Sequence, residues 1–473
     1  MTSPDVLDAL RLLQTGRLRE AAIKLKHLRE GRPDAPDVLQ AAAMVAMQRG
    51  DFVTAEDVCA AWVKSMPEHP LPQARLGTAQ MHQGRFDDAR STLDQGLKKY
   101  ADDPHLTRAR AELAEREGQP KDAWQRIEPL QQHDDPSIRV EAARVALAAG
   151  HAEVAQAIAE VLLAEASVPT IVHRRAAFVR ARALETQGDL EKAWDAYVAA
   201  NKVGARPFDP AAYDDYVNRI IAAYPRPIET DEKPLAEDVV FVVGSPRTGS
   251  SLLERIVDAH PEGYGLGEIS LGGELLQHIP AQGKQPWFSR SHKLSPADQQ
   301  KMQNTYLTPL RELSPNVKRR LDKNLTNLSR IGLLGQLFPG AKAVICQREP
   351  IPCGLSCFVQ DLSPAGFPWS SDPAHIARAL RAQSRLCAHW LETKPLTMID
   401  VRYEDFVAGG EAAQRGLIEG IGLEWDPACA KFHSQKGRGT TTSSYAQVQK
   451  PMHASANQAG SKWGDRLELF RCP

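Results

Sequence analysis

Residues 239–243 (VVFVV) form an unbroken apolar run, and the glycine-flanked loop GSPRTGSS and an amphipathic pattern follow it. A run of β-branched and aromatic residues without alternation is typical of a parallel strand covered on both faces. We therefore predict a strand, a tight loop and a helix. The backbone N–H groups of such a loop converge at the helix N-terminus and form an anion site.

Further strand candidates follow along the chain, and helical patterns separate them. Basic residues stand at their ends, Lys323 after one and Arg348 after the next. The three stretches are 317–324, 341–350 and 396–406. Strands that alternate with helices form a parallel sheet, so we expect Arg247, Lys323 and Arg348 to meet at its carboxyl edge around one polyanion.

The first two hundred residues contain a recurring turn that carries a glycine, with an alanine five positions later. The first three intervals between these glycines are 34 residues each. The turns are Gly16/Ala21, Gly50/Ala55, Gly84/Ala89, Gly118/Ala123, Gly150/Ala155 and Gly188/Ala193. Glycine in a left-handed cap ends the first helix of a hairpin, and the small alanine lets the second helix approach. Pro36, Pro70 and Pro104 open the following repeats.

This pattern resembles the tetratricopeptide repeat family over about residues 5–200. The resemblance implies an all-α solenoid with a surface for a peptide or a partner protein, and a purely structural array is the alternative. Residues 213–224 read as a capping helix, and proline-rich, charged sequence follows. We predict an array over 1–225, a linker over 226–237 and a second domain over 238–473.

Composition narrows the classes of function. The 473 residues hold 58 Lys and Arg against 59 Asp and Glu, so neither a nucleic-acid-binding face nor an acidic tail is expected. The N-terminus is charged and the chain contains no long apolar stretch, so we expect neither a signal peptide nor a membrane span. A cytoplasmic location is the expectation that follows. Seven cysteines without paired C-x-x-C spacing predict reduced thiols and no metal site.

The loop has the G-x-x-x-x-G spacing of phosphate-binding loops, from Gly244 to Gly249. Ser250 stands where nucleotide triphosphatases carry lysine, and the cation is Arg247 inside the loop. Arginine grips a phosphate bidentately, whereas the missing lysine removes the point charge that bridges the β- and γ-phosphates. We expect the loop to bind a phosphate in a manner that differs from the usual ATP site. A plain glycine turn is the alternative.

Residues 238–466 resemble the sulfotransferase superfamily, which uses 3′-phosphoadenosine 5′-phosphosulfate (PAPS), and are most similar to its protein-tyrosine sulfotransferase branch. The resemblance rests on GSPRTGSSLLERIVDAHP, on REPIPCGLS and on SYAQVQKP followed by SKW. A repeat array fused to such a domain is a recognised bacterial arrangement. The resemblance implies an α/β, P-loop-like domain with a central parallel sheet. Sulfuryl transfer needs cations and positioning but no obligatory magnesium ion, which suits the missing lysine.

The resemblance also implies roles for individual residues. It implies that the loop binds the 5′-phosphate and the sulfate of PAPS and that Arg348 and Ser356 bind its 3′-phosphate. A closing segment would supply further contacts. The loop residues are Arg247, Thr248, Gly249, Ser250 and Ser251, and those of the closing segment are Tyr445, Lys450 and Lys462. Ser444 is the alternative to Tyr445, and exposed charge is the alternative for the two lysines.

A hydroxyl nucleophile must lose its proton as it attacks, and two positions compete for the base. Glu268 in GYGLGEIS matches the catalytic glutamate of the protein-tyrosine branch, with a surface or helix-capping carboxylate as the alternative. The histidine of the small-molecule branch is missing, because Asn324 and Leu325 follow Lys323. Lys323 would stabilise the leaving phosphate, and Arg247 the transferred group. His260 reads as a helix-end group.

The expected activity is transfer of a sulfuryl group from PAPS to an acceptor hydroxyl, with the bisphosphate nucleotide PAP as product and no metal requirement. A protein tyrosine is the acceptor that the resemblance implies, and a small phenol, carbohydrate or lipid hydroxyl stays open. The repeats would bind the acceptor or a partner. The alternatives are a catalytically silent nucleotide-binding scaffold and an atypical phosphotransferase.

Overall fold

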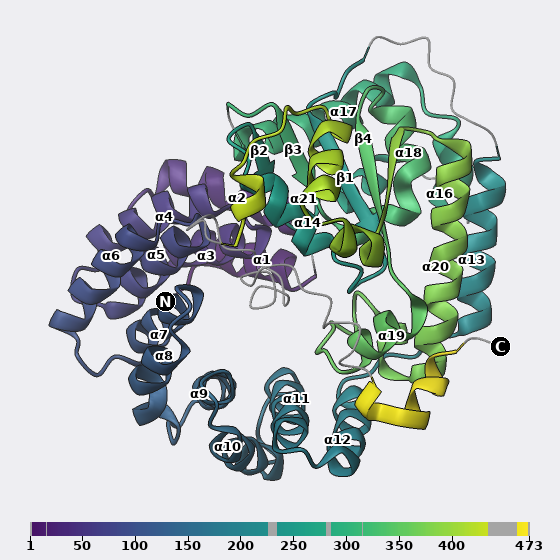
Figure 1. Cartoon of the computed structure of the whole chain (residues 1–473). Helices are drawn as coiled ribbons and strands as arrows, with labels where there is room; N and C mark the ends of the chain where they lie inside the picture. The colour runs from purple at the N-terminus through teal and green to yellow at the C-terminus, as the bar shows by residue number, and fades with distance from the viewer. Residues whose placement is uncertain are drawn as a thin grey trace. The chain divides into compact units, whose positions relative to one another are not determined.

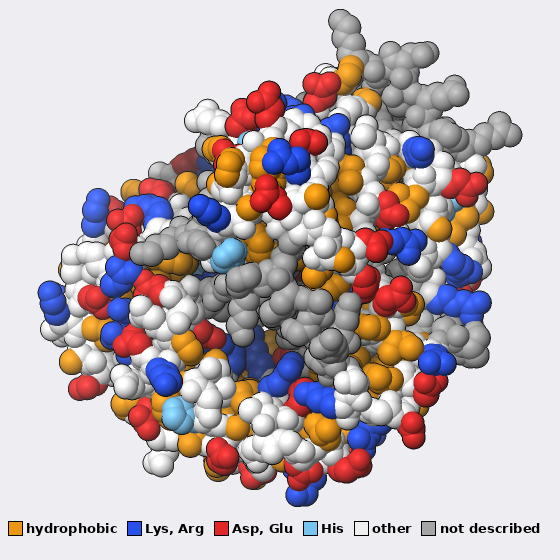
Figure 2. Space-filling view, in the orientation of Figure 1, with side chains coloured by type: hydrophobic (Ala, Val, Ile, Leu, Met, Phe, Trp, Pro, Cys, Tyr) orange, Lys and Arg blue, Asp and Glu red, His pale blue; other side chains and the backbone are white. Residues whose placement is uncertain are grey.

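The computed structural model describes residues 2–15, 17–225, 234–280, 285–314, 316–433 and 461–471. These residues fall into two compact units, one up to Val172 and the other from His173 onward. Among the described residues, no helix combines the length and apolar character needed to cross a bilayer. Acidic and basic side chains are interspersed over the face of the described surface drawn in Figure 2, in keeping with the nearly balanced charge.

The first unit consists of antiparallel helices stacked in pairs (Figure 1). Its helices are α1 Pro4–Gln14, α2 Leu18–Gly31, α3 Pro36–Arg49, α4 Phe52–Ser65, α5 Pro70–His82, α6 Phe86–Lys99, α7 Pro104–Arg116, α8 Pro120–Ile127, α9 Pro136–Ala148 and α10 Ala152–Ala164. The predicted glycine caps are confirmed, because the repeat glycines have positive φ; these are Gly50, Gly84, Gly118, Gly150 and Gly188. Gly16 lies outside the described residues. All six predicted alanines are fully buried. The solenoid expected from the turns is therefore present.

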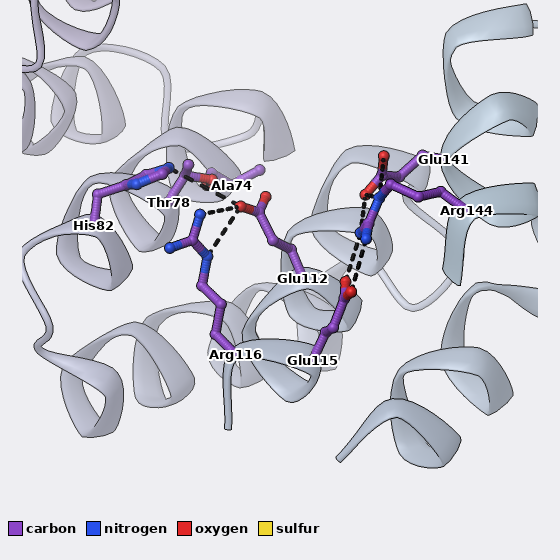
Figure 3. Close-up of polar contacts among 8 residues, drawn as sticks. All are labelled: Ala74, Thr78, His82, Glu112, Glu115, Arg116, Glu141 and Arg144. Carbon is purple, nitrogen blue, oxygen red and sulfur yellow. Dashed lines mark hydrogen bonds and ion pairs between the residues drawn. The ribbon is translucent and has the colours of Figure 1, made fainter. Parts of the chain in front are cut away.

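Ion pairs tie neighbouring repeats of this unit together. Arg144 of α9 donates from both ends of its guanidinium to Glu115 of α7, at 2.7 and 2.5 Å, and also to Glu141 at 2.7 Å (Figure 3). In the repeat before, burial and the charge of Arg116 lower the pKa of His82 to about 3. His82, whose Nε2 lies 4.0 Å from Glu112, is therefore neutral at physiological pH and forms no ion pair there.

The second unit begins with α11 (Thr170–Gln187, from His173), α12 (Leu190–Lys202) and α13 (Pro210–Ala223), and a five-stranded sheet with its helices follows. The later elements are β1 Val239–Gly244, α14 Ser250–Asp258, β2 Gly263–Gly265, α15 Leu271–Glu274, α16 Trp287–Ser291, α17 Pro296–Leu313, β3 Arg319–Asp322, α18 Ile331–Leu337, β4 Lys342–Gln347, α19 Pro350–Phe358, α20 Pro373–Thr393, β5 Thr397–Arg402 and α21 Tyr403–Gly420. A 3₁₀ segment, η6, spans Ser461–Phe470 and is kinked at Gly464.

The sheet is parallel throughout, in the order β2-β3-β1-β4-β5. Every residue of β1 is buried, because alternate side chains enter two cores. Val239, Phe241 and Val243 face the core under α13, α17, α18 and α20, whereas Val240 and Val242 face the core under α14 and α21. The predicted α/β domain with a central parallel sheet is confirmed.

Helix α13, predicted to cap the repeat array, packs on the sheet domain. Val217, Ile220 and Tyr224 join the core that holds Trp390, and Asp214 pairs with Arg378 and Arg385 of α20 at 2.8 and 2.9 Å. Packing thus groups α11 to α13 with the sheet. Residues 226–233 of the expected linker lie outside the described residues, and the boundary over 226–237 stays a proposal.

Candidate functional site

The phosphate-loop sequence leaves the carboxyl end of β1 at the point where the sheet order reverses. Strand β1 lies between β3 and β4, so the connections on its two sides run in opposite directions. In open parallel sheets the crevice at such a switch point is the usual ligand site. Thr248, Ser250 and Ser251 of the loop and of the first turn of α14 are all buried there.

Glycine is required at both ends of this loop. Gly244 has φ of 148°, and a Cβ there would lie 2.3 Å from the carbonyl oxygen of Cys346. Gly249 has φ of 92°, and a Cβ there would lie 2.5 Å from the ring of Tyr403. Arg247 also adopts positive φ, at 68°, and Thr248 Oγ1 donates to the Ser245 carbonyl at 2.7 Å. The loop is thus held tightly between β4 and the start of α21.

Two predicted anion-binding residues meet the loop arginine. Arg247 Nε donates to Ser356 Oγ of α19 at 2.9 Å, and Arg348 Nη1 donates to the Arg247 carbonyl at 3.0 Å. The Arg348 guanidinium also lies over the Tyr403 ring, 4.6 Å from its centroid. Residues separated by a hundred positions in the sequence therefore form one cationic cluster at the carboxyl ends of β1 and β4.

Behind this cluster, Cys353 and Cys357 lie one turn apart on α19. Their thiols point at the Pro246 carbonyl, with Sγ–O distances of 3.3 and 3.6 Å. Both side chains are buried beneath the loop. Among the described residues, no group of three metal-ligating side chains gathers here or elsewhere. The two cysteines thus pack under the backbone that presents Arg247.

Lys323 and Glu268 form an ion pair at the carboxyl ends of β3 and β2. Lys323 Nζ lies 2.8 Å from Glu268 Oε1, and the Lys323 N–H donates to the Gly267 carbonyl at 3.0 Å. The lysine side chain is 0% exposed, whereas that of Glu268 is 48% exposed. The pair therefore offers an accessible carboxylate whose partner cation is buried.

Sequence reasoning missed a third member of this arrangement, Glu254 of α14. Its Oε1 accepts a hydrogen bond from the Gly267 N–H at 2.7 Å, and its Oε2 lies 3.8 Å from Lys323 Nζ. Burial raises the pKa of Glu254 to about 7, although the charge of Lys323 acts in the opposite direction. Burial acts to lower the pKa of the Lys323 ammonium, but the charges of Glu254 and Glu268 outweigh burial, so that pKa is raised.

Buried hydrogen bonds fix the segment that carries Lys323. Asp322 accepts from Tyr306 at 2.6 Å and from Asn327 at 3.0 Å, and Asn324 Nδ2 donates to the Ile269 carbonyl at 2.7 Å. Burial raises the pKa of Asp322 to about 6. Asn324, the residue after Lys323, thus ties the Glu268 segment to the Lys323 segment.

The remaining predicted residues contact other parts of the chain or lie outside the described residues. Tyr445, Lys450 and the alternative Ser444 lie outside the described residues. Lys462 of η6 forms an ion pair with Glu185 of α11 at 2.8 Å. His260 lies two residues past the end of α14, where Nδ1 accepts from the Glu262 N–H and Nε2 lies 2.8 Å from the Glu424 carbonyl oxygen. It is therefore a helix-end group, as its position in the sequence indicated.

Comparison with known families agrees with this architecture. Residues 239–427 match the model of the sulfotransferase family. Residues 46–113 and 140–210 match two models of the tetratricopeptide repeat. The family match spans β1 to the end of the sheet and includes Arg247, Glu268, Lys323, Arg348 and Ser356.

Individual relatives are distant. An uncharacterized Aquifex aeolicus protein is 25% identical over 67% of this chain and 43% of its own length. Protein-tyrosine sulfotransferase 1 of Danio rerio is 24% identical over 49% of this chain and 67% of its own. For protein-tyrosine sulfotransferase 2 of Gallus gallus the values are 22%, 48% and 62%. The chain thus spans less than half of the first relative and about two thirds of the other two.

Solved structures resemble parts of the chain. The sulfotransferase domain of the Synechococcus PCC 7002 olefin synthase is 19% identical and covers 50% of this chain and 91% of its own, with a TM-score of 0.35. A thermophilic tetratricopeptide-repeat protein of Thermus thermophilus is also 19% identical and covers 37% and 96%, with a TM-score of 0.33.

Proposed function

The chain joins tetratricopeptide repeats to a domain of the sulfotransferase family, and from this premise we propose that it transfers a sulfuryl group from PAPS to an acceptor hydroxyl. The observation that carries the proposal is the Lys323–Glu268 pair at the edge of the sheet that also presents Arg247 and Arg348. A base, a buried cation and an anion cradle are the three parts that such a transfer needs.

The residues of the loop suit the donor. N–H groups at the start of α14, the Thr248, Ser250 and Ser251 hydroxyls and the Arg247 guanidinium would hold the 5′-phosphate and sulfate. Arg348 and Ser356 would hold the 3′-phosphate, and the Arg247–Ser356 hydrogen bond supports a single continuous site. When bound, the donor supplies an activated sulfuryl group on a phosphate leaving group.

The Lys323–Glu268 geometry supports an in-line transfer. Glu268 would take the proton from the acceptor hydroxyl as its oxygen forms the new bond to sulfur. The bond between sulfur and the bridging oxygen breaks, and Lys323 would stabilise the charge that develops on that oxygen. Glu268, being half exposed, can meet an acceptor from solvent, whereas the buried Lys323 keeps a fixed position. No step in this scheme calls on a metal ion.

A tyrosine side chain is the acceptor that we propose, on the strength of the two protein-tyrosine sulfotransferase relatives. The repeats would present the acceptor protein or bind a partner. Left-handed glycine caps and buried alanines at every described turn support an intact array that can serve as such a platform.

The test is transfer of labelled sulfur from PAPS to a library of tyrosine-containing peptides by the full chain. We expect label in peptide with wild type and a loss of at least a hundredfold with Glu268→Ala and with Arg247→Ala. Transfer that survives both substitutions would contradict the site. Donor binding without transfer to peptides or to other hydroxyl compounds would favour a scaffold. Magnesium-dependent transfer from ATP would favour a phosphotransferase.

A further inference from the structure

The last helical pair before α13 is built into the sheet unit. Arg174 at the start of α11 donates to Asp361 at 2.7 Å and to the Leu362 carbonyl at 3.1 Å, beyond the end of α19. Asn201 of α12 donates to the Phe358 carbonyl at 2.8 Å. These contacts, two of them buried, fix the carboxyl end of α19, the helix that carries Ser356, against α11 and α12.

An aromatic cluster strengthens this attachment. Trp194 of α12 lies 4.9 Å from Phe358 of α19 and 5.5 Å from Trp463 of η6, measured between ring centroids. Tyr197 and Phe470 complete the cluster, and η6 lies beside α12 and α19 in Figure 1. This aromatic packing fixes α12 against α19, and the Arg174 hydrogen bonds fix α11 against the segment that follows α19.

Arg182 lies on α11 about two turns after Arg174. Its Nη2 is 3.5 Å from the Val359 carbonyl oxygen, one turn past Ser356, whose hydroxyl accepts the hydrogen bond from Arg247. Glu185 lies 3.5 Å from Arg182 and 2.8 Å from Lys462, so it stands between the two cations. The Arg182 side chain is 41% exposed and is therefore accessible to a ligand.

Three guanidinium groups from three parts of the chain thus contact the loop or α19. Arg247 donates to Ser356, Arg348 donates to the Arg247 carbonyl, and Arg182 of α11 donates to the Val359 carbonyl, one turn past Ser356. Burial lowers the pKa of Arg247, and the like charges of Arg348 and Arg182 act in the same direction. Like charges in a poorly solvated site repel one another, and an anion placed among them relieves that repulsion. The arrangement suits a ligand group with more than one negative charge.

We propose that Arg182, supplied by the last helical pair before α13, is a donor-site residue that binds the phosphate on the 3′ position of the donor ribose. This inference rests on the proposed function. It explains why α11 and α12 are fastened to α19, since the same contacts that hold Ser356 also hold Arg182. The last helical pair, which packs with the sheet, would then contribute to the donor site.

The competing explanation is that Arg182 only caps the carboxyl end of α19, where a cation is favourable. Calorimetric titration of the full chain with adenosine 3′,5′-bisphosphate and with AMP, which lacks the 3′-phosphate, separates the two. With Arg182→Gln we expect about tenfold weaker binding of the bisphosphate, equivalent to one charge-assisted hydrogen bond, and unchanged binding of AMP. Arg182→Lys, which keeps the charge, should recover part of the loss.

The matched control is Arg175→Gln, an exposed arginine on the same helix, which should leave both affinities unchanged. Thermal unfolding without ligand reports whether each variant is folded. If Arg182→Gln lowers the unfolding temperature but binds the bisphosphate as wild type does, Arg182 is a cap and the inference is wrong. If wild type itself fails to bind the bisphosphate, the proposed function fails and this inference fails with it.

Discussion

Lys323 Nζ lies 2.8 Å from Glu268 Oε1, and this ion pair joins the ends of two adjacent parallel strands. The register of β2 and β3 brings Lys323 and Glu268 together. Gly263 pairs with Arg319, so the segments that follow the two strands leave the sheet side by side. Glu254 Oε2 lies 3.8 Å from the same ammonium. One buried cation therefore serves two carboxylates of different exposure.

Removal of the cation should disable transfer. In Lys323→Ala, the developing charge on the leaving oxygen loses its stabilising group, and we expect transfer to fall by about a hundredfold to a thousandfold. Initial rates with labelled donor measure this. Lys318→Ala, an exposed lysine just before the same strand, is the matched control and should keep the wild-type rate. A Lys323→Ala rate within twofold of wild type would remove Lys323 from the mechanism.

The pKa of Glu254 predicts a pH dependence of stability. Because the pKa of this carboxyl is raised to about 7 in the folded protein, the folded chain binds the proton more tightly than the unfolded chain does. Deprotonation of Glu254 should therefore lower the free energy of unfolding as the pH rises from about 4.5 to about 7. Glu254→Gln keeps an acceptor for the Gly267 N–H and removes the titration, so its curve should fall less over that range.

Unfolding by urea at several pH values measures this difference. Glu262→Gln, which changes an exposed carboxylate on the connection between α14 and β2, should follow the wild-type curve. Asp322 should also lower the free energy of unfolding as the pH rises, since burial raises its pKa to about 6. Parallel curves for wild type and Glu254→Gln would show that Glu254 titrates normally in the folded chain.

The loop glycine Gly249 should be essential for donor binding. A Cβ at Gly249 would lie 2.5 Å from Tyr403 and would be held at φ of 92°, so Gly249→Ala must displace the loop. We expect at least tenfold weaker binding of adenosine 3′,5′-bisphosphate by calorimetry. Gly416→Ala in α21, where a Cβ meets nothing within 4 Å, is the control. Equal affinities for both variants would argue against the loop as the binding site.

The repeat turns should be sensitive to backbone strain alone. Gly118 has φ of 77° and open space around it, so Gly118→Ala should destabilise the first unit by about 1 kcal/mol. Gly31 also has open space but lies at the end of α2 without positive φ, so Gly31→Ala should be neutral or slightly stabilising. Urea midpoints compare the two, and equal midpoints would contradict left-handed capping at Gly118.

Much of this fold follows from local patterns. The unbroken apolar run at 239–243 became a strand buried on both faces, and the recurring Gly and Ala pairs became capped helical hairpins. Strand β2 could not be predicted from periodicity, because three residues with two glycines, Gly263 and Gly265, carry no apolar pattern. Its place beside β3 depends on tertiary pairing.

Part of the candidate site could also be predicted from local sequence patterns. Basic residues at strand ends were expected to converge, and Arg247 and Arg348 do. Glu254 was missed because a carboxylate in an amphipathic helix normally faces solvent. Its signal was the glycine spacing opposite it: a Cβ at Gly265 would lie 2.7 Å from Glu254 Cγ, and the Gly267 N–H bonds to its carboxylate. The pairing of Lys462 with Glu185 depended on long-range packing that no local pattern encodes.

The measurement that tests the account most directly separates donor binding from transfer in Glu268→Gln. This variant keeps the size of the side chain and an acceptor oxygen near Lys323 but cannot take a proton. We predict that it binds adenosine 3′,5′-bisphosphate within about twofold of wild type while transfer of labelled sulfur to a tyrosine peptide falls by about a hundredfold or more. Wild-type transfer by Glu268→Gln would contradict the assignment of Glu268 as the base.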